Sequence, residues 1–157
     1  MKKVRMISSA AMLALMAVGT VSMTSCTKDD CATGYEGKDC TTEIRAEMMG
    51  SYNATDVNDA DATEVYSYVA VAAPGATVTI ANLSNFGDFF GTGEIVTSNV
   101  TKSGNDISFT IPAQKPDGVY TVSGQGTYNT STKKATVKYA LANGISTNNY
   151  TGTWSKQ

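Results

Sequence analysis

Alternation of apolar and polar residues dominates the chain beyond residue 50 and is typical of β-strands with one buried face. Residues 107–111 are the clearest case, because Ile107, Phe109 and Ile111 face one way while hydroxyl side chains face the other. Eight segments carry strand patterns and are separated by turn signals: residues 51–55, 64–73, 77–80, 94–101, 107–111, 119–129, 133–141 and 149–156. Short strands at hairpin spacing predict an all-β, antiparallel up-and-down barrel of about eight strands that closes on itself.

Two stretches are predicted to lie outside the barrel wall. Residues 42–49 are predicted to form a short helix, because Thr41 or Thr42 can cap its start and Gly50 can end it. Residues 56–61 are rich in aspartate and are predicted to form a polar connection between the first two strands.

Four acids in and just after this connection raise the question of a calcium site. They are Asp56, Asp59, Asp61 and Glu64. An EF-hand loop requires glycine at its sixth position and a bidentate acid at its twelfth. Counted from Asp56, these positions hold Asp61 and Ser67. The sequence therefore predicts a solvated hairpin here and no metal ion.

The first 25 residues have the three-part layout of a secretory signal peptide. Three basic residues, Lys2, Lys3 and Arg5, precede an apolar run over residues 6–18, and small and polar residues follow. The apolar run is too short to span a membrane as a mature helix. Residues 1–25 are therefore predicted to form a leader helix that is removed on export.

Residues 23–26, Met-Thr-Ser-Cys, resemble a bacterial lipobox, in which the cysteine is acylated and becomes the new N-terminus. The resemblance implies that Cys26 carries a lipid anchor. Each buried methylene contributes about 0.8 kcal/mol, so several acyl chains hold a soluble domain firmly on a membrane. Residues 28–30, Lys-Asp-Asp, resemble the surface-export signal of Bacteroidetes lipoproteins and imply the outer membrane and the cell surface. The alternative is an ordinary leader cut nearby, with Cys26 left as a free thiol.

Cys31 and Cys40 lie in the pattern Cys-x-x-Gly-Tyr-x-Gly-x-x-Cys, which resembles the last loop of an EGF-like module. The final two cysteines of that module pair, so the resemblance implies one disulfide and an oxidising compartment. The other four cysteines of the module are absent, and we call residues 31–40 the hook. With the lipidated tether it forms a predicted N-terminal segment over residues 26–41. Metal binding by the two cysteines is disfavoured, because the chain has no histidine and no second ligand pair.

Further short motifs resemble small Bacteroidetes lipoproteins with a calycin-like β-barrel. Residues 45–52, residues 111–114 (Ile-Pro-Ala-Gln) and residues 150–154 (Tyr-Thr-Gly-Thr-Trp) carry this resemblance together with the hook. Gly-x-Tyr at residues 50–52 is similar to the Gly-x-Trp start of lipocalin-type barrels, with tyrosine in place of tryptophan. The resemblance implies a calycin-like barrel domain over residues 42–157.

Charge and composition narrow the function classes. Of 12 basic and 14 acidic residues, three basic ones belong to the leader, so 9 against 14 remain and the mature net charge is −5. This balance argues against nucleic acid as a partner. The absence of histidine excludes Ser-His-Asp and Cys-His catalysis. The acids fall in turns rather than as a pair facing a cavity, so glycosidase chemistry is disfavoured. We therefore expect no enzyme, no catalytic residues and no cofactor.

An eight-stranded barrel is either filled by side chains or holds one small ligand. Gly124 and Gly126, flanked by Tyr120 and Tyr128, mark a face of the predicted strand 119–129 where a cavity could open. The alternative is that the glycines only bend the strand.

Phe86, Phe89 and Phe90 lie in a glycine-flanked loop. They are candidates for a mobile lid or an exposed binding patch, and the alternative is that they plug one end of the barrel.

Three functions remain open from the sequence. The first is a surface-tethered module that captures a small apolar or amphipathic ligand in the barrel, which an internal cavity would favour. The second is a structural or interaction lipoprotein that binds an envelope protein or a glycan through its loops, which a packed interior with exposed phenylalanines would favour. The third is a barrel-type hydrolase inhibitor, which a protruding loop held at both ends would favour.

Overall fold

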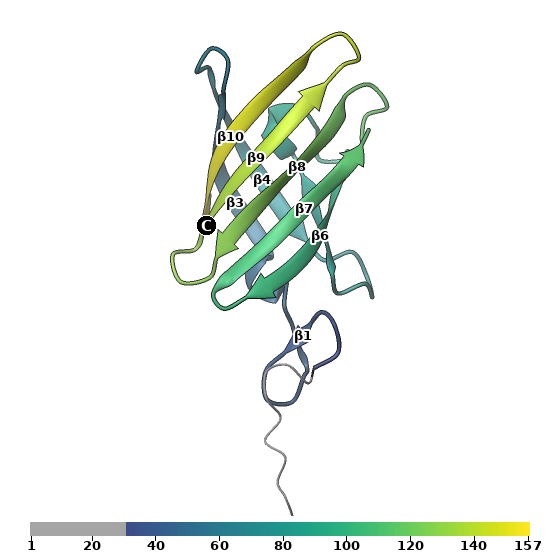
Figure 1. The fold of residues 1–157 in the computed structure, drawn as a ribbon, viewed down its shortest axis with the longest axis vertical. Helices are drawn as coiled ribbons and strands as arrows, with labels where there is room; N and C mark the ends of the chain where they lie inside the picture. The colour runs from purple at the N-terminus through teal and green to yellow at the C-terminus, as the bar shows by residue number, and fades with distance from the viewer. Residues whose placement is uncertain (1–30) are drawn as a thin grey trace, which may run out of the picture.

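Eight antiparallel strands close into one barrel (Figure 1). The computed structural model describes residues 31–157; the predicted leader and Cys26 lie outside the described residues. The barrel strands are β3 (Gly50–Asn58), β4 (Glu64–Ala72), β5 (Ile80–Ser84), β6 (Val96–Ser103), β7 (Asp106–Gln114), β8 (Thr121–Asn129), β9 (Lys134–Ala142) and β10 (Thr147–Lys156). Each strand pairs with the next along the chain, and β10 closes the barrel on β3. The predicted all-β, up-and-down closed barrel is confirmed.

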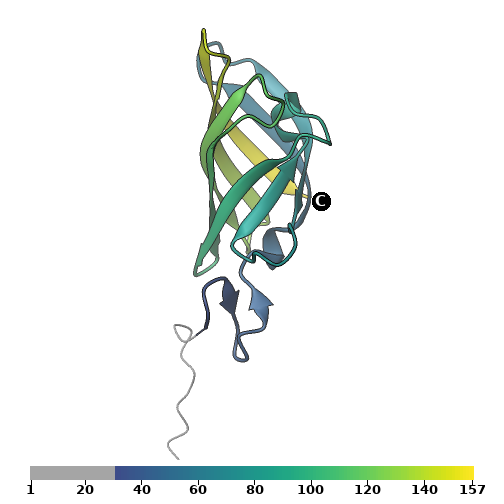
Figure 2. The same cartoon turned by 90° about the vertical axis from the view of Figure 1, so that its right-hand side faces the viewer.

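The hook is a disulfide-linked hairpin below one end of the barrel (Figure 2). Cys31 and Cys40 are bonded, with an S–S distance of 2.01 Å, as the resemblance implied. Two short strands, β1 (Tyr35–Glu36) and β2 (Thr42–Glu43), pair antiparallel next to the disulfide. Lys102 on β6 reaches down to the hook, and its Nζ lies 2.5 Å from the Glu36 carboxylate. The hook and the barrel are therefore joined by side chains as well as by the chain itself.

The predicted helix over residues 42–49 is wrong. Its first part is strand β2, and only η1 (Ala46–Met48) forms a single 3₁₀ turn. The Ile44 amide donates to the Gly34 carbonyl at 2.9 Å, which extends the hairpin pairing past β2. A helix of two turns is marginal in water, so the hairpin hydrogen bonds prevail.

Arg45 locks this connection to the barrel. Its side chain is 1% exposed, and its guanidinium donates to the carbonyl oxygens of Thr77 at 2.8 Å, Gly75 at 3.1 Å and Ile80. Its Nε lies 2.8 Å from the Glu43 carboxylate. Gly75 and Thr77 belong to the connection between β4 and β5, and Ile80 is the first residue of β5, so Arg45 fixes this connection at the point where β5 begins.

Two predicted strand boundaries differ from the structure. The strand predicted over residues 77–80 instead begins at Ile80 and continues to Ser84, because the carbonyls before it turn toward Arg45. The first strand extends to Asn58 and does not end at Thr55. Asp56 therefore lies inside the barrel wall and not in a polar connection.

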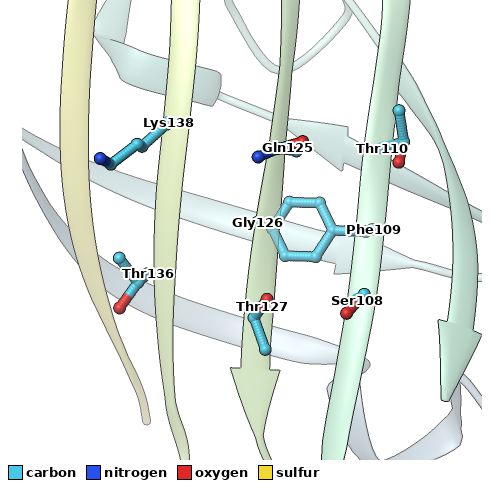
Figure 3. A pocket seen from close by; sticks show the side chains of 8 residues that line it. All are labelled: Ser108, Phe109, Thr110, Gln125, Gly126, Thr127, Thr136 and Lys138. Atoms are coloured by element: carbon cyan, nitrogen blue, oxygen red, sulfur yellow. The ribbon is translucent and has the colours of Figure 1, made fainter. Parts of the chain in front are cut away.

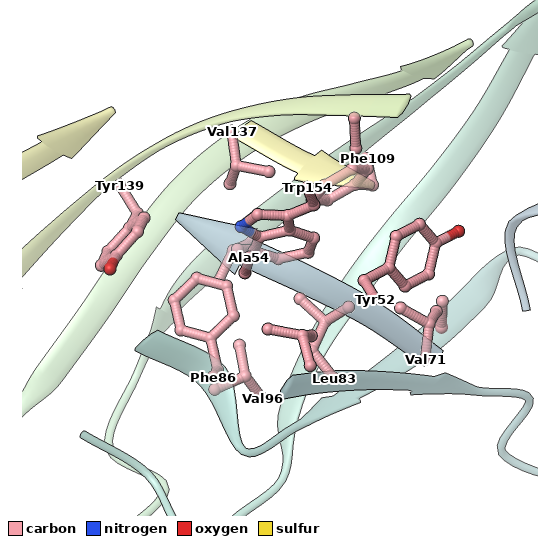
Figure 4. Packing of buried hydrophobic residues seen from close by; sticks show 14 of the residues in the cluster. Tyr52, Ala54, Val71, Leu83, Phe86, Val96, Phe109, Val137, Tyr139 and Trp154 are labelled. Atoms are coloured by element: carbon pink, nitrogen blue, oxygen red, sulfur yellow. The ribbon is translucent and has the colours of Figure 1, made fainter. Parts of the chain in front are cut away.

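Aromatic side chains fill the barrel interior (Figure 4). Trp154 lies at the centre, with ring centroids of Phe86 at 5.5 Å, Phe109 at 6.1 Å and Tyr52 at 6.2 Å. The Tyr52 hydroxyl donates to the Met48 carbonyl at 2.6 Å, so η1 covers the interior at the hook end. Burial of several large aromatic side chains is the main favourable contribution to the stability of this small barrel.

Candidate functional site

Exposed apolar side chains gather at the barrel end opposite the hook, which we call the mouth. The mouth consists of the loops at residues 59–63, 85–95, 115–120 and 143–146 (Figures 1 and 2). Among residues 31–157, five of the seven exposed large apolar side chains lie on these loops: Phe89, Ile95, Val119, Tyr120 and Ile145. Apolar groups concentrated at one end of a small domain are typical of an interaction site.

A small pocket lies within the mouth. Its volume is about 130 Å³, and its lining consists of Phe89, Tyr120, Leu141, Asn143, Ser146, Asn148 and Tyr150. The rings of Phe89 and Tyr150 meet at an angle of 59°, with centroids 5.4 Å apart. Tyr139 stacks against Tyr150 from the barrel side at 5.0 Å. A cavity of roughly 150 Å³ holds a molecule the size of benzene, so this mouth pocket accommodates one ring or one compact branched group.

Hydrogen bonds within the loops hold the pocket walls in place. Asp117 Oδ1 accepts from the backbone amides of Val119 at 2.9 Å and Tyr120 at 2.8 Å. Asn143 Oδ1 accepts from the amides of Ile145 at 2.9 Å and Ser146 at 2.8 Å. Loops fixed before a ligand arrives lose less entropy on binding, so the pocket is preorganised.

The three predicted phenylalanines divide between two roles. Phe86 and Phe90 are buried, and the Phe86 ring packs against Tyr139 at 4.7 Å, so these two side chains plug the mouth end of the barrel. Phe89 is 38% exposed and lines the mouth pocket. The plug anticipated as the alternative is present, and one of the three residues remains accessible to a ligand.

The two predicted glycines face a filled interior. The Phe109 ring lies against Gly126 (Figure 3), and a Cβ at Gly126 would come within 2.3 Å of its Cζ. At Gly124 a Cβ would lie 2.7 Å from the Tyr139 Cβ. Glycine thus lets aromatic side chains approach β8 closely, and no deep cavity opens at this face.

The two tyrosines that flank these glycines are not brought together. Tyr120 lies at the mouth and lines the pocket, whereas Tyr128 is buried toward the hook end, with its ring 5.9 Å from that of Tyr52. Outside Gly126, the wall carries a shallow depression of about 320 Å³ whose lining includes Gln125 and Lys138 (Figure 3). Of the predicted ligand-binding residues, Tyr120 and Phe89 meet in one pocket.

Asp56 is a buried acid that the strand prediction placed wrongly. It is 0% exposed, and its carboxylate accepts from the Trp154 indole at 2.9 Å and the Tyr139 hydroxyl at 3.0 Å. Burial raises the pKa of this carboxyl, and the two hydrogen bonds oppose that effect. Gly152 on β10 leaves room for it, since a Cβ there would lie 2.0 Å from Asp56 Oδ1. The sequence held a signal for this burial. Tyr52, Ala54 and Asp56 are spaced two residues apart, so a strand that turns Tyr52 inward also turns Asp56 inward.

The Asp56 carboxylate supports the pocket from below. It holds the hydroxyl of Tyr139, and the Tyr139 ring stacks at 12° on Tyr150, a wall of the mouth pocket. Buried hydrogen bonds of this kind fix the orientation of the groups that they join. The carboxylate has no contact with the pocket itself, so we assign it a structural role.

No group of three or more His, Cys, Asp or Glu within residues 31–157 is placed to hold a metal ion. No helix in that range is long and apolar enough to cross a membrane. No protein-family model matches the chain, and no curated protein or solved structure shows significant similarity to it.

Proposed function

We propose that this protein is a non-catalytic binding module that captures a small apolar or amphipathic ligand at the mouth of its barrel. The observation that carries the proposal is the mouth pocket, a preorganised aromatic hollow at the end where exposed apolar side chains gather. Such a hollow, apolar with a few polar groups, is the usual form of a small-molecule site.

The filled interior limits the size of this ligand. Phe86 and Phe90 close the barrel beneath the pocket, and Trp154 occupies the centre of the barrel. We therefore expect a ring or a compact branched group to enter the pocket, with the remainder of the ligand outside. A whole lipid chain inside the barrel is not part of the proposal.

We expect benzyl alcohol, a ring with one hydroxyl, to bind in the pocket and to show this by saturation-transfer NMR. Tyr120→Ala removes one wall of the pocket and should weaken binding about tenfold, which corresponds to about 1.4 kcal/mol. Tyr66→Ala is the matched control, since Tyr66 is a 67% exposed tyrosine on the outer face of β4. Equal affinity in both variants would place the ligand elsewhere and reject the mouth pocket.

A lipid anchor at the outer membrane and the cell surface is the second part of the proposal. Cys26 precedes Cys31 by five positions, and the hook lies at the end opposite the mouth (Figure 2). Five residues span at most about 17 Å, so an anchor at Cys26 would hold the hook end near the membrane and leave the mouth facing away from it. Mass spectrometry of the N-terminal peptide should find an acylated Cys26, and protease treatment of intact cells should remove the protein. An unmodified Cys26 would contradict the anchor, and protection from protease would contradict surface placement.

A macromolecular partner is the second candidate. Val119 is 59% exposed and Ile145 is 97% exposed, so both project beyond the pocket. These side chains favour contact with an envelope protein or a glycan through the loops. If a macromolecule binds through these loops, Ile145→Ser should abolish its binding to the protein and leave the binding of benzyl alcohol unchanged.

A further inference from the structure

Two walls of the mouth pocket lie in loops that also carry an acid. Asp117 accepts the backbone amide of Tyr120 at 2.8 Å, so its negative charge lies at the base of this wall. Asp88 is exposed and directly precedes Phe89 in the same loop. Both acids belong to loops that form the pocket itself.

Tyr150, the third aromatic wall of the mouth pocket, has two acids near it, Asp59 and Asp61. The Asp59 amide donates to the Asn149 carbonyl at 2.9 Å, and Asp59 and Tyr150 line one shallow hollow below the mouth. Burial raises the pKa of Tyr150, and the negative charge of Asp61 raises it further. Because like charges disfavour a phenolate, this shift agrees with an acid near the Tyr150 ring.

The two ends of the barrel differ in charge. The mouth loops and the first residue of β4 carry six acids and one base, Lys115, a net charge of −5; the acids are Asp59, Asp61, Glu64, Asp88, Glu94 and Asp117. Most described bases lie at the hook end instead: Lys38, Arg45, Lys102, Lys133, Lys134 and Lys156. A surface of one sign raises the local concentration of the opposite ion, so the mouth attracts cations and repels anions.

We propose that the mouth pocket binds a small, soluble organic cation, a substituted ammonium group whose carbon atoms contact Phe89, Tyr120 and Tyr150. This inference rests on the proposed function and names the ligand class of the same site. Aromatic faces attract ammonium groups through their ring electrons, and recognition of quaternary ammonium by aromatic walls is a known use of this attraction. The surrounding carboxylates supply the long-range part of the attraction.

The lining selects against other ions. A bare metal ion needs several oxygen ligands that converge on one point, and the pocket lining contains aromatic rings and amides but no carboxylate. Anions are repelled by the acids around the mouth. A weakly hydrated organic cation satisfies both features, because its apolar surface fits the rings and its charge fits the rim.

The test compares choline with its neutral carbon analogue, 3,3-dimethylbutan-1-ol, on the purified full chain by NMR titration. The two probes share shape and hydroxyl group and differ in charge. We expect choline to bind at least tenfold more tightly at low salt, with the difference reduced at high salt, because exposed charges are screened.

Variants locate the source of the selectivity. D61N/D88N should weaken choline binding about tenfold and leave the neutral probe unchanged, since asparagine keeps the size of each side chain and removes only its charge. D39N/D106N removes the same charge at the hook end and should change neither probe. Equal affinity of both probes would overturn the cation proposal and leave the proposed function intact. Absence of binding by both probes and by benzyl alcohol would overturn both.

Discussion

Replacing Asp56 by alanine is expected to lower the free energy of unfolding by about 3 kcal/mol at pH 7. The change leaves the Trp154 indole N–H and the Tyr139 hydroxyl without their buried acceptor. Each unsatisfied buried group costs about 1–3 kcal/mol, which exceeds the gain from removing a buried carboxylate. Urea unfolding followed by Trp154 fluorescence measures the loss. An alanine variant as stable as the natural protein would show that the buried carboxylate contributes no net stability.

Asp56→Asn is the matched control and also reports the titration of this group. An amide oxygen can accept from Trp154, and the Tyr139 hydroxyl can rotate to accept from the amide nitrogen, so most of the stability should remain. Burial raises the pKa of Asp56 above its ordinary value of 3.8. The folded state therefore holds the proton more tightly than the unfolded state. The stabilising contribution is complete below pH 3.8 and is lost as pH rises through the pKa of the folded protein. The natural protein should lose stability relative to the Asn variant from pH 4 upward, and parallel curves would contradict the raised pKa.

Replacing Arg45 by methionine is expected to lower the free energy of unfolding by about 4 kcal/mol, because it breaks the ion pair with Glu43 and removes the buried donor to the carbonyl oxygens of Thr77, Gly75 and Ile80. Methionine retains the apolar stem, so the loss reports the guanidinium and not the packing. The same urea unfolding measures the change. Hydrogen exchange should in addition become faster in residues 73–80, the segment whose carbonyls Arg45 holds.

Arg45→Lys separates charge from geometry in this contact. A lysine ammonium keeps the charge beside Glu43 but lacks the planar fork that reaches Thr77, Gly75 and Ile80 together. Its stability should fall between those of the natural protein and the methionine variant. A methionine variant within about 1 kcal/mol of the natural protein would mean that water satisfies these carbonyls equally well.

The barrel could be predicted because its signal is local. Ile107, Phe109 and Ile111 alternate with polar residues, and all three are buried in the structure. Period-two alternation reports which face of a strand is buried without knowledge of its neighbours. Where tertiary contacts compete with local preference, the prediction is wrong: hairpin pairing at Thr42–Glu43 replaces the expected helix, and the β3–β10 pairing carries the first strand through Asp56.

The candidate site could be predicted only in part. Phe89 stands out in the sequence as an aromatic residue in a glycine-flanked loop, and Tyr120 as an aromatic neighbour of Gly124 in the predicted strand 119–129; both line the mouth pocket. Asn143, Ser146 and Asn148 carry no such signal, because polar residues are common in any hairpin turn. They join the site only because the up-and-down topology brings the β9–β10 turn to the same end as the other two loops.

The sequence by itself determined the number of strands in the barrel, the buried face of clear cases such as residues 107–111 and, through its resemblance to an EGF-like loop, the pairing of Cys31 with Cys40. Only the tertiary structure decided whether the barrel is hollow. Glycine at position 126 removes a side chain from the interior, but the Phe109 ring from the neighbouring strand occupies the space. Cavities depend on the summed volume of side chains from all strands, which no single segment encodes. The site therefore lies at the mouth, where the loops meet, and not within the barrel.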